Sequence, residues 1–242
     1  MAREITFMEA INEGLDMAMA KDERVILLGE DIAGGVKVTH LEEGNAEAWG
    51  GVFGVTKGLM QKYGRERVID TPISEMGYLG ASVGAAATGL HPVPELMFND
   101  FIGVCFDTIL TQGSKMRYMF GGKATIPMTV RTTHGAGASA AAQHSGSYYG
   151  MLGAIPGIKV VVPATPYDAK GLLLSAIEEN NIVIFSEDKT LYGIKGEVPE
   201  DYYTVPIGQA NVRQEGTDLT IVTIGKMLYV ALDVAKQLAQ SG

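Results

Sequence analysis

The sequence predicts an α/β fold with a doubly wound, mostly parallel sheet, followed by the beginning of a second α/β domain. Apolar runs of strand length alternate with segments of helical period along the first part of the chain, which is the pattern of a parallel sheet covered by helices. A segment rich in turn residues then precedes one further strand and helix. We therefore expect a first domain over residues 1–195, a linker over 196–214 and an incomplete second domain over 215–242, because one strand and one helix cannot bury a core.

The first elements have clear local signals. Thr6 and Glu9 fit a capping box, and apolar residues follow at helical spacing, so we expect a helix near 7–20. The apolar run at 25–28 predicts a buried parallel strand, and Glu30 follows it at the carboxyl edge, where ligands bind in open α/β sheets. Residues 32–55 are rich in glycine and have no steady period, which favours a long surface loop.

Alternating elements continue to the end of the chain. Strands are expected at 68–70, 93–97, 126–131, 159–162, 182–186 and 219–224. Helices are expected near 55–63, from 75 to about 90, near 101–116, and at 166–178 and 227–240.

Composition and charge narrow the function classes. Hydrophobic residues make up 46% and charged residues 19%, so the chain is globular and not a disordered tail. A net charge of −9 disfavours nucleic acid and anionic membrane surfaces as partners. The single Cys105 excludes an internal disulfide, and the N-terminus carries charges where a signal peptide needs an apolar core. We expect a cytoplasmic protein.

Glu75 is the strongest candidate for a catalytic residue. It follows a turn after the strand at 68–70 and precedes a glycine- and alanine-rich helix without charged residues, which we expect to be buried all round. A carboxylate at the head of such a helix is desolvated, which raises its pKa and favours a neutral, proton-donating acid near pH 7. The alternative interpretation is an ordinary surface glutamate, which most glutamates are.

His144 is the second candidate. It lies within residues 132–158, which contain no Asp, Glu, Lys or Arg and many small residues. Such a segment packs against another chain or lines a cofactor cleft. A lone histidine is more often structural, but a loop of this kind at a sheet edge suits an acid–base histidine. His134 is a weaker candidate in the same segment.

Two familiar motifs are disfavoured by their context. Residues 80–84 match the G-x-S-x-G nucleophile elbow of hydrolases, but Ser82 falls inside the predicted helix. Residues 135–140 match a dinucleotide fingerprint, but no acidic residue follows about twenty positions later to hold a ribose. The sequence also has no zinc-protease motif, paired-cysteine motif or Walker loop.

The strings IDTPISEMGYLGASVGAAATGL, PVPELMFNDF and AAQHS resemble the β subunits of the thiamine-diphosphate-dependent components of pyruvate, branched-chain oxo-acid and acetoin dehydrogenase complexes. The resemblance covers nearly the whole chain and implies a transketolase-like pyrimidine domain. EAWGGVFGVTKGL, RYMFGGKA and PYDAKGLL are closer to the acetoin branch. The implied activity is cleavage of acetoin to acetaldehyde, with oxidative transfer of the acetyl unit to a lipoyl acceptor. Pyruvate or a branched-chain oxo acid is the alternative substrate, and a non-catalytic assembly module is the alternative from another class.

The resemblance also implies roles for individual residues. Glu75 would hydrogen-bond N1′ of the thiamine aminopyrimidine, Phe101 would stack on that ring, and Met97 would contact the cofactor. His144 would lie near the reacting carbon and the lipoyl group, and Glu30 would line a path between paired active sites. The chain departs from the family after the histidine, where residues 146–149 read Gly-Ser-Tyr-Tyr in place of a glutamine-containing sequence.

A further departure implies a partner. Thiamine enzymes hold the diphosphate and Mg²⁺ with a Gly-Asp-Gly motif followed by an asparagine, and this sequence has no Gly-Asp-Gly. We therefore expect an α subunit to supply that half of the site, in an α2β2 heterotetramer that also meets a lipoyl-bearing acetyltransferase. Some relatives suggest K⁺ near Glu179 and Asn181.

Overall fold

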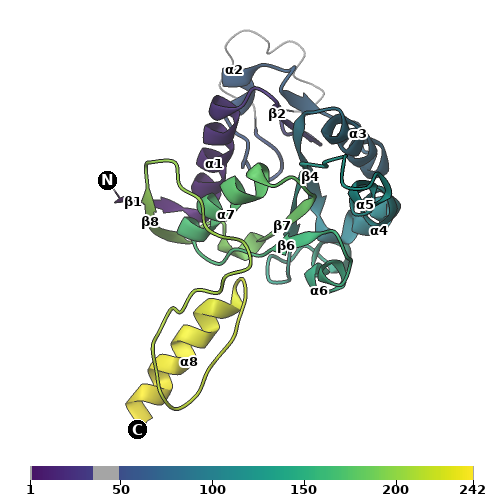
Figure 1. The fold of residues 1–242 in the computed structure, drawn as a ribbon. Helices are drawn as coiled ribbons and strands as arrows, with labels where there is room; N and C mark the ends of the chain where they lie inside the picture. Colours follow the sequence, from purple (N-terminus) through teal and green to yellow (C-terminus); the bar gives the residue numbers. More distant parts are fainter. Residues whose placement is uncertain (1, 35–48, 242) are drawn as a thin grey trace.

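A six-stranded parallel sheet forms the centre of the molecule (Figure 1). The structure is a computed structural model that describes residues 2–34 and 49–241, so the loop predicted over 32–55 lies partly outside the described residues. The strand order is β3-β2-β4-β5-β7-β6, with every neighbouring pair parallel. The strands are β2 (Val25–Gly29), β3 (Val68–Asp70), β4 (His91–Phe98), β5 (Thr129–His134), β6 (Lys159–Val161) and β7 (Val183–Asp188).

Helices cover both faces of this sheet, which confirms the doubly wound α/β prediction. On one face α1 (Phe7–Lys21) and α7 (Pro166–Glu178) enclose a core that contains Phe7, Leu173 and Phe185. On the other face α3 (Glu75–Ala87) and α4 (Ile102–Asp107) enclose a second core. The remaining helices are α2 (Leu59–Tyr63), α5 (Met116–Met119), α6 (Tyr149–Gly153) and α8 (Met227–Ser241). Short helical turns lie at Asn99–Phe101 (η2), Thr108–Gly113 (η3), Ala142–His144 (η4) and Lys189–Leu191 (η5).

Local capping fixes the start of two long helices. At α1, the Thr6 hydroxyl accepts the Glu9 N–H at 3.1 Å, while the Glu9 carboxylate accepts the Thr6 N–H at 2.7 Å. The predicted capping box is therefore confirmed. At α7, the Thr165 hydroxyl accepts the Asp168 N–H at 3.1 Å, and Pro166 occupies the first helical position.

Several boundaries differ from the prediction. A two-stranded antiparallel ribbon joins β1 (Ala2–Thr6) to β8 (Lys195–Pro199), so residues 196–199, expected in a linker, form a strand. The helix expected near 101–116 is divided into η2, α4, the π-helical η3 and α5. Short ribbons and π turns depend on pairing and packing more than on a local apolar pattern, which explains why the sequence does not reveal them.

The expected burial of the glycine- and alanine-rich helix on all sides is wrong for this chain. The inward face of α3 buries Tyr78, Leu79 and Val83, whereas Met76 is 55% exposed and the neighbouring small residues face outward. The helix lacks charge on a face that its own chain does not cover. A charge-free helix therefore predicts an apolar surface and not burial within one chain.

The C-terminal segment is only partly as predicted. The helix expected at 227–240 is confirmed as α8, which projects away from the main body (Figure 1). The strand expected at 219–224 is absent, and Leu219 and Val222 are exposed. An isolated strand has no partner for its backbone groups, so an apolar run alone does not form one. Within the described ranges, no helix is long and apolar enough to cross a membrane.

Candidate active site

Chemically versatile side chains gather at the carboxyl edge of the sheet. Glu30 follows β2, the segment from Met97 to Phe101 ends β4, and the loop that carries His144 follows β5. Because these strands are parallel neighbours, their carboxyl ends share one edge. The structure therefore groups residues that lie more than a hundred positions apart in the sequence.

Glu75 and Glu30 form an acidic group at this edge. Glu75 is the first residue of α3 and is 8% exposed. Burial, together with the charges of Glu75, Asp31 and Glu95, raises the pKa of Glu30 to about 6. Among the described residues, Glu30 Oε1 is buried without a hydrogen-bond partner. A buried acceptor without a partner in the protein can accept a hydrogen bond from a bound ligand.

The surroundings of Glu75 are otherwise apolar or weakly polar. Burial and the charge of Glu75 together raise the pKa of the Cys105 thiol to about 12, which puts the two side chains within electrostatic reach. Burial and the charges of Glu30 and Glu75 likewise raise the pKa of Tyr78. The Tyr78 hydroxyl donates to the Glu95 carbonyl at 3.1 Å, which ties α3 to β4.

An aromatic group lies next to these acids. The His144 ring meets Phe98 edge to face with centroids 4.4 Å apart, and meets Phe101 at 5.5 Å. Phe98 and Phe101 are themselves 5.6 Å apart. The Phe101 carbonyl accepts the Cys105 thiol at 3.6 Å, and the charge of Glu75 acts on that same thiol. Such edge-to-face contacts hold planar rings in defined orientations.

Met97 lies at an irregularity of the sheet. The register between β4 and β5 shifts between Leu96 and Phe98, and the Met97 side chain is half-buried. Its carbonyl accepts the Thr133 hydroxyl at 2.6 Å. Irregularities of this kind re-aim a side chain at the end of a strand.

His134 is a structural histidine. β5 extends to residue 134, so His134 is buried at a strand end and does not lie in the loop expected from the sequence. Its Nδ1 is 2.8 Å from the Ser186 hydroxyl, and its ring packs on Tyr149. Burial lowers the pKa of His134, and nearby Lys189 lowers it further against the opposing charge of Asp188.

A buried ion cluster beneath the edge is absent from the sequence-based prediction. Arg131 on β5 donates to Glu95 on β4 at 2.7 Å and to Glu187 on β7 at 2.8 and 2.9 Å. Tyr192 also donates to Glu187, at 2.7 Å. Burial alone would lower the pKa of Arg131, but the two carboxylates raise it above its usual value. The sequence signal that could have revealed this cluster is a charged residue within each of three otherwise apolar strands, because buried charges require partners.

The two residues suggested for a K⁺ site contact protein cations. Lys159 forms an ion pair with the Glu179 carboxylate, and Arg117 donates to Asn181 Oδ1 at 3.0 Å. In the described part of the chain, no three His, Cys, Asp or Glu side chains are grouped for a metal ion.

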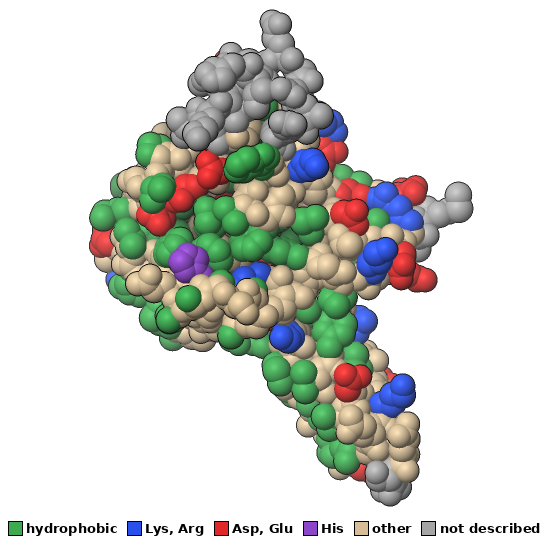
Figure 2. All heavy atoms as spheres, turned by 180° about the vertical axis from the view of Figure 1, so that it is seen from behind, with side chains coloured by type: hydrophobic (Ala, Val, Ile, Leu, Met, Phe, Trp, Pro, Cys, Tyr) green, Lys and Arg blue, Asp and Glu red, His purple; other side chains and the backbone are tan. Residues whose placement is uncertain are grey.

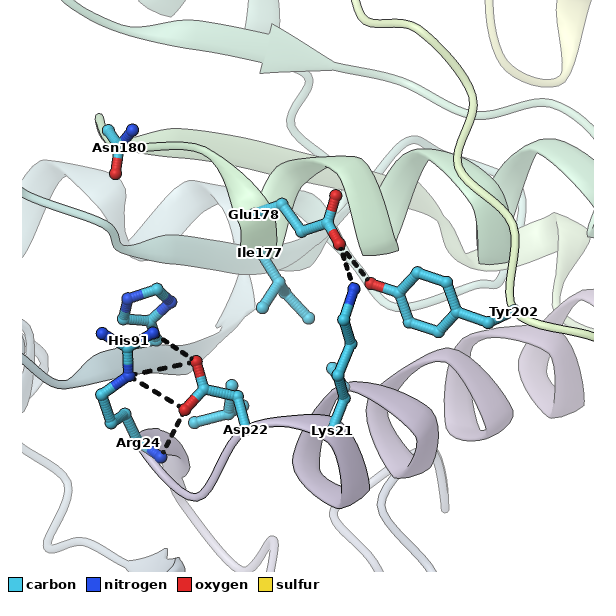
Figure 3. Close-up of a pocket in the computed structure, with 10 residues that line it drawn as sticks. Lys21, Asp22, Arg24, His91, Ile177, Glu178, Asn180 and Tyr202 are labelled. Carbon is cyan, nitrogen blue, oxygen red and sulfur yellow. Dashed lines mark hydrogen bonds and ion pairs between the residues drawn. The ribbon is translucent and has the colours of Figure 1, made fainter.

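A cavity of about 550 Å³ opens at the opposite, amino edge of the sheet (Figure 3). Its walls come from the ends of α1 and α7 and the starts of β2 and β4. Lys21 pairs with Glu178 at 2.7 Å, and Arg24 pairs with Asp22 at 2.7 Å. These charges satisfy one another, and the cavity is remote from Glu75 and His144.

Apolar side chains are exposed over a broad area of the surface seen from behind the view of Figure 1 (Figure 2). Exposed apolar residues lie on the turn before α3, on α3, α4 and α5, and on the turn after α5: Ile73, Met76, Val104, Tyr118, Met119 and Phe120. Large exposed apolar areas mark sites of contact with other chains.

Comparison with known proteins shows the family of the chain. The transketolase pyrimidine-binding domain family matches residues 3–195, and the transketolase C-terminal domain family matches residues 208–242. The β subunit of acetoin:2,6-dichlorophenolindophenol oxidoreductase from Bacillus subtilis is 62% identical over the full chain and is covered to 70% of its own length. The chain belongs to the family of acetoin and 2-oxo acid dehydrogenase β subunits.

Other members of this β-subunit family are less similar. The acetoin oxidoreductase β subunit of Cupriavidus necator is 54% identical over 242 residues, covering all of this chain and 70% of that one. The pyruvate dehydrogenase E1 β subunit of B. subtilis is 41% identical over 240 residues, covering 99% and 70%. A solved split-gene transketolase, described as an inactive β4 tetramer, superposes with a TM-score of 0.74 at 22% identity, covering 98% of this chain and 68% of that one. At that identity the likeness concerns the fold alone.

Proposed function

We propose that this chain is the β subunit of an acetoin:acceptor oxidoreductase and binds the aminopyrimidine half of thiamine diphosphate. The observation that carries the proposal is the pairing of buried Glu75, at the head of α3, with Glu30, whose Oε1 has no partner among the described residues. The family is thiamine-diphosphate-dependent, and acetoin enzymes at 62% and 54% identity favour acetoin over the pyruvate enzyme at 41%.

The residues at the carboxyl edge fit an aminopyrimidine. This ring is flat and carries a nitrogen that can share a proton with a carboxyl group. The rings of Phe98, Phe101 and His144 offer apolar faces and edges beside the Glu75 end of α3. The fit does not extend to a diphosphate, because the sequence has no Gly-Asp-Gly motif. We assign the diphosphate and Mg²⁺ to an α subunit.

Thiamine diphosphate supplies the carbon nucleophile and the electron sink for cleaving a carbon–carbon bond next to a carbonyl. Glu75 would share a proton with the ring nitrogen N1′, and its burial would strengthen that hydrogen bond. Phe101 and Met97 would contact the flat ring and exclude water from it. Glu30, whose pKa is raised to about 6, would be a second proton-exchanging group beside Glu75. His144 would exchange a proton with the acyl acceptor.

The exposed apolar area supports assembly with an α subunit as an α2β2 heterotetramer, which receives a lipoyl-bearing acetyltransferase. We assign the pyrimidine domain to residues 1–195 and the start of a second domain to residues 215–242, and the matches over 3–195 and 208–242 support this division. The lone Cys105 is consistent with a cytoplasmic location.

Co-expression with an α subunit tests the proposal. The purified complex should reduce 2,6-dichlorophenolindophenol with acetoin only when thiamine diphosphate and Mg²⁺ are added. Pyruvate and branched-chain oxo acids serve as competing substrates in the same assay. A higher kcat/KM for pyruvate than for acetoin would assign the chain to the pyruvate branch, and no turnover with any of them would favour an assembly role.

A further inference from the structure

The segment that carries His144 is a loop whose two ends are joined. The Gly135 N–H donates to the Gly146 carbonyl at 3.0 Å, so residues 136–145 leave and return at one point beside the end of β5. Loops with adjoining ends keep their shape through contacts at the base and within the loop. The contacts at the base, which we call the neck, therefore control where His144 lies.

The turn after β4 holds one side of the neck. Both oxygens of Asp100 accept the Gly146 N–H, at 3.0 and 3.2 Å. Oδ1 of the fully buried Asn99 accepts the Tyr148 N–H at 2.7 Å. A hydrogen bond to an ionised carboxylate is stronger than one between neutral groups, and shielding from water strengthens both bonds.

Lys189 holds the other side. Lys189 is only 7% exposed, and its ammonium donates to the Gly135 carbonyl. Burial lowers the pKa of Lys189, while the charges of Asp188 and Asp100 oppose that shift. A cation therefore binds Gly135 and an anion binds Gly146, and the two charges attract each other.

Only glycine fits at position 146. A Cβ there would lie 2.6 Å from Asp100 Oδ1 and 2.4 Å from the Tyr148 ring. Residues 146–149, which depart from the family pattern, therefore include the backbone groups that Asn99 and Asp100 bind at the end of the neighbouring strand.

The loop inside the neck is strained. Ser139 has φ 54° and Ala141 has φ 60° with ψ −172°, a combination that glycine tolerates and alanine does not. Such a conformation is unfavourable for a residue with a Cβ and persists only where surrounding contacts fix it. Ala141 immediately precedes the turn that ends at His144. Opening the neck would release this strain and move His144 away from Phe98 and Phe101.

We propose that Asn99, Asp100 and Lys189 are positioning residues that hold the neck closed and thereby keep His144 against Phe98 and Phe101. The catalytic consequence rests on the proposed function, whereas the effect on the loop does not.

The test uses the assembled α–β complex and compares Asp100→Ala with Asp100→Asn. An asparagine oxygen can still accept the Gly146 N–H, so it should restore most of what alanine removes. Hydrogen–deuterium exchange over residues 135–148, without substrate, should be about ten-fold faster in Asp100→Ala, the change expected from losing one buried hydrogen bond. Turnover with a lipoyl domain should fall several-fold more than turnover with the dye. Asp107→Ala, at an exposed aspartate on α4, is the matched control.

Each result decides the proposal. Unchanged hydrogen–deuterium exchange in Asp100→Ala would show that Asp100 does not hold the neck closed. Faster exchange with an unchanged ratio of lipoyl turnover to dye turnover would show that the neck does not position His144. Lys189→Met, which removes the donor on the other side, serves if Asp100→Ala does not assemble and should give the same pattern. Absence of acetoin turnover in the wild type would contradict the proposed function. The exchange result would still show whether Asp100 holds the loop closed.

Discussion

Environment separates the titratable residues of the site into different roles. Glu30 and Glu75 share an acidic, partly buried edge, whereas His134 and His144 differ because one ends a buried strand and the other sits in a loop against aromatic rings. The absence of nearby charge makes Glu75 and His144 candidates from the sequence. The sequence placed His134 in the same loop as His144, because the end of β5 depends on pairing with β7 as far as residue 134.

His144→Ala should leave cofactor binding intact and impair transfer to the acyl acceptor. Within the described residues the ring packs on Phe98 and Phe101 and makes no side-chain hydrogen bond, so its loss removes a proton carrier more than a structural support. We expect turnover with a lipoyl domain to fall about 10²-fold, the scale of one general acid–base group. Dye reduction should change much less. Equal, wild-type rates with both acceptors would make His144 a structural residue.

Glu30 should destabilise the folded chain at high pH. Its pKa is about 6 in the fold against an ordinary value of 4.5, so the folded state binds this proton more tightly than the unfolded state. The stabilising contribution is full below pH 4.5 and is lost as the pH rises through 6. Glu30→Gln should therefore raise the free energy of unfolding by roughly 1 kcal/mol at pH 8, after allowance for partial exposure, and by little near pH 5. Urea unfolding at both pH values measures this, and an equal effect at both would contradict it.

At the scale of elements, local signals predicted helices better than strands. α1 and α7 begin where their caps require, because capping is encoded within four residues. The strand expected at 219–224 did not form, and β1 and β8 were missed, because strands depend on partners distant in sequence. The neck of the His144 loop was also beyond prediction, since its contacts join β4, β5 and β7.

The Arg131 cluster should be a main support of the sheet edge. Arg131→Leu would leave Glu95 and Glu187 buried without their partner. Losing one member of a buried ion cluster costs about 3–5 kcal/mol, so we expect a large fall in unfolding free energy. Arg24→Leu, at an exposed ion pair, is the control and should change stability by less than about 1 kcal/mol. Comparable losses in the two variants would show that the cluster is no stronger than a surface pair.

At the scale of the whole molecule, the proposed function makes this edge of the sheet one half of an active site. The carboxyl edge offers acids and aromatic rings, and broad apolar surfaces on α3, α4 and α5 remain uncovered by the chain itself. The missing Gly-Asp-Gly motif predicted this division from the sequence. The charge-free α3 was instead expected to be buried within the chain, because a sequence does not say which polypeptide covers an apolar face.

The chain alone should therefore bind thiamine diphosphate poorly. Calorimetric titration of the purified chain with cofactor and Mg²⁺ should show no strong binding, while the α–β complex should bind it tightly. Submicromolar affinity in the single chain would mean that the diphosphate half of the site lies here after all.

Exchange of the thiazolium C2 proton of bound cofactor in the α–β complex is the most direct test of Glu75. In Glu75→Gln the amide keeps the shape of the side chain but cannot share a proton with N1′, so we expect exchange to slow by about 10²–10⁴-fold with the fold intact. Glu23→Gln, at an exposed glutamate, controls for the loss of a charge and should exchange at the wild-type rate. An unchanged exchange rate in Glu75→Gln would show that Glu75 does not activate the cofactor.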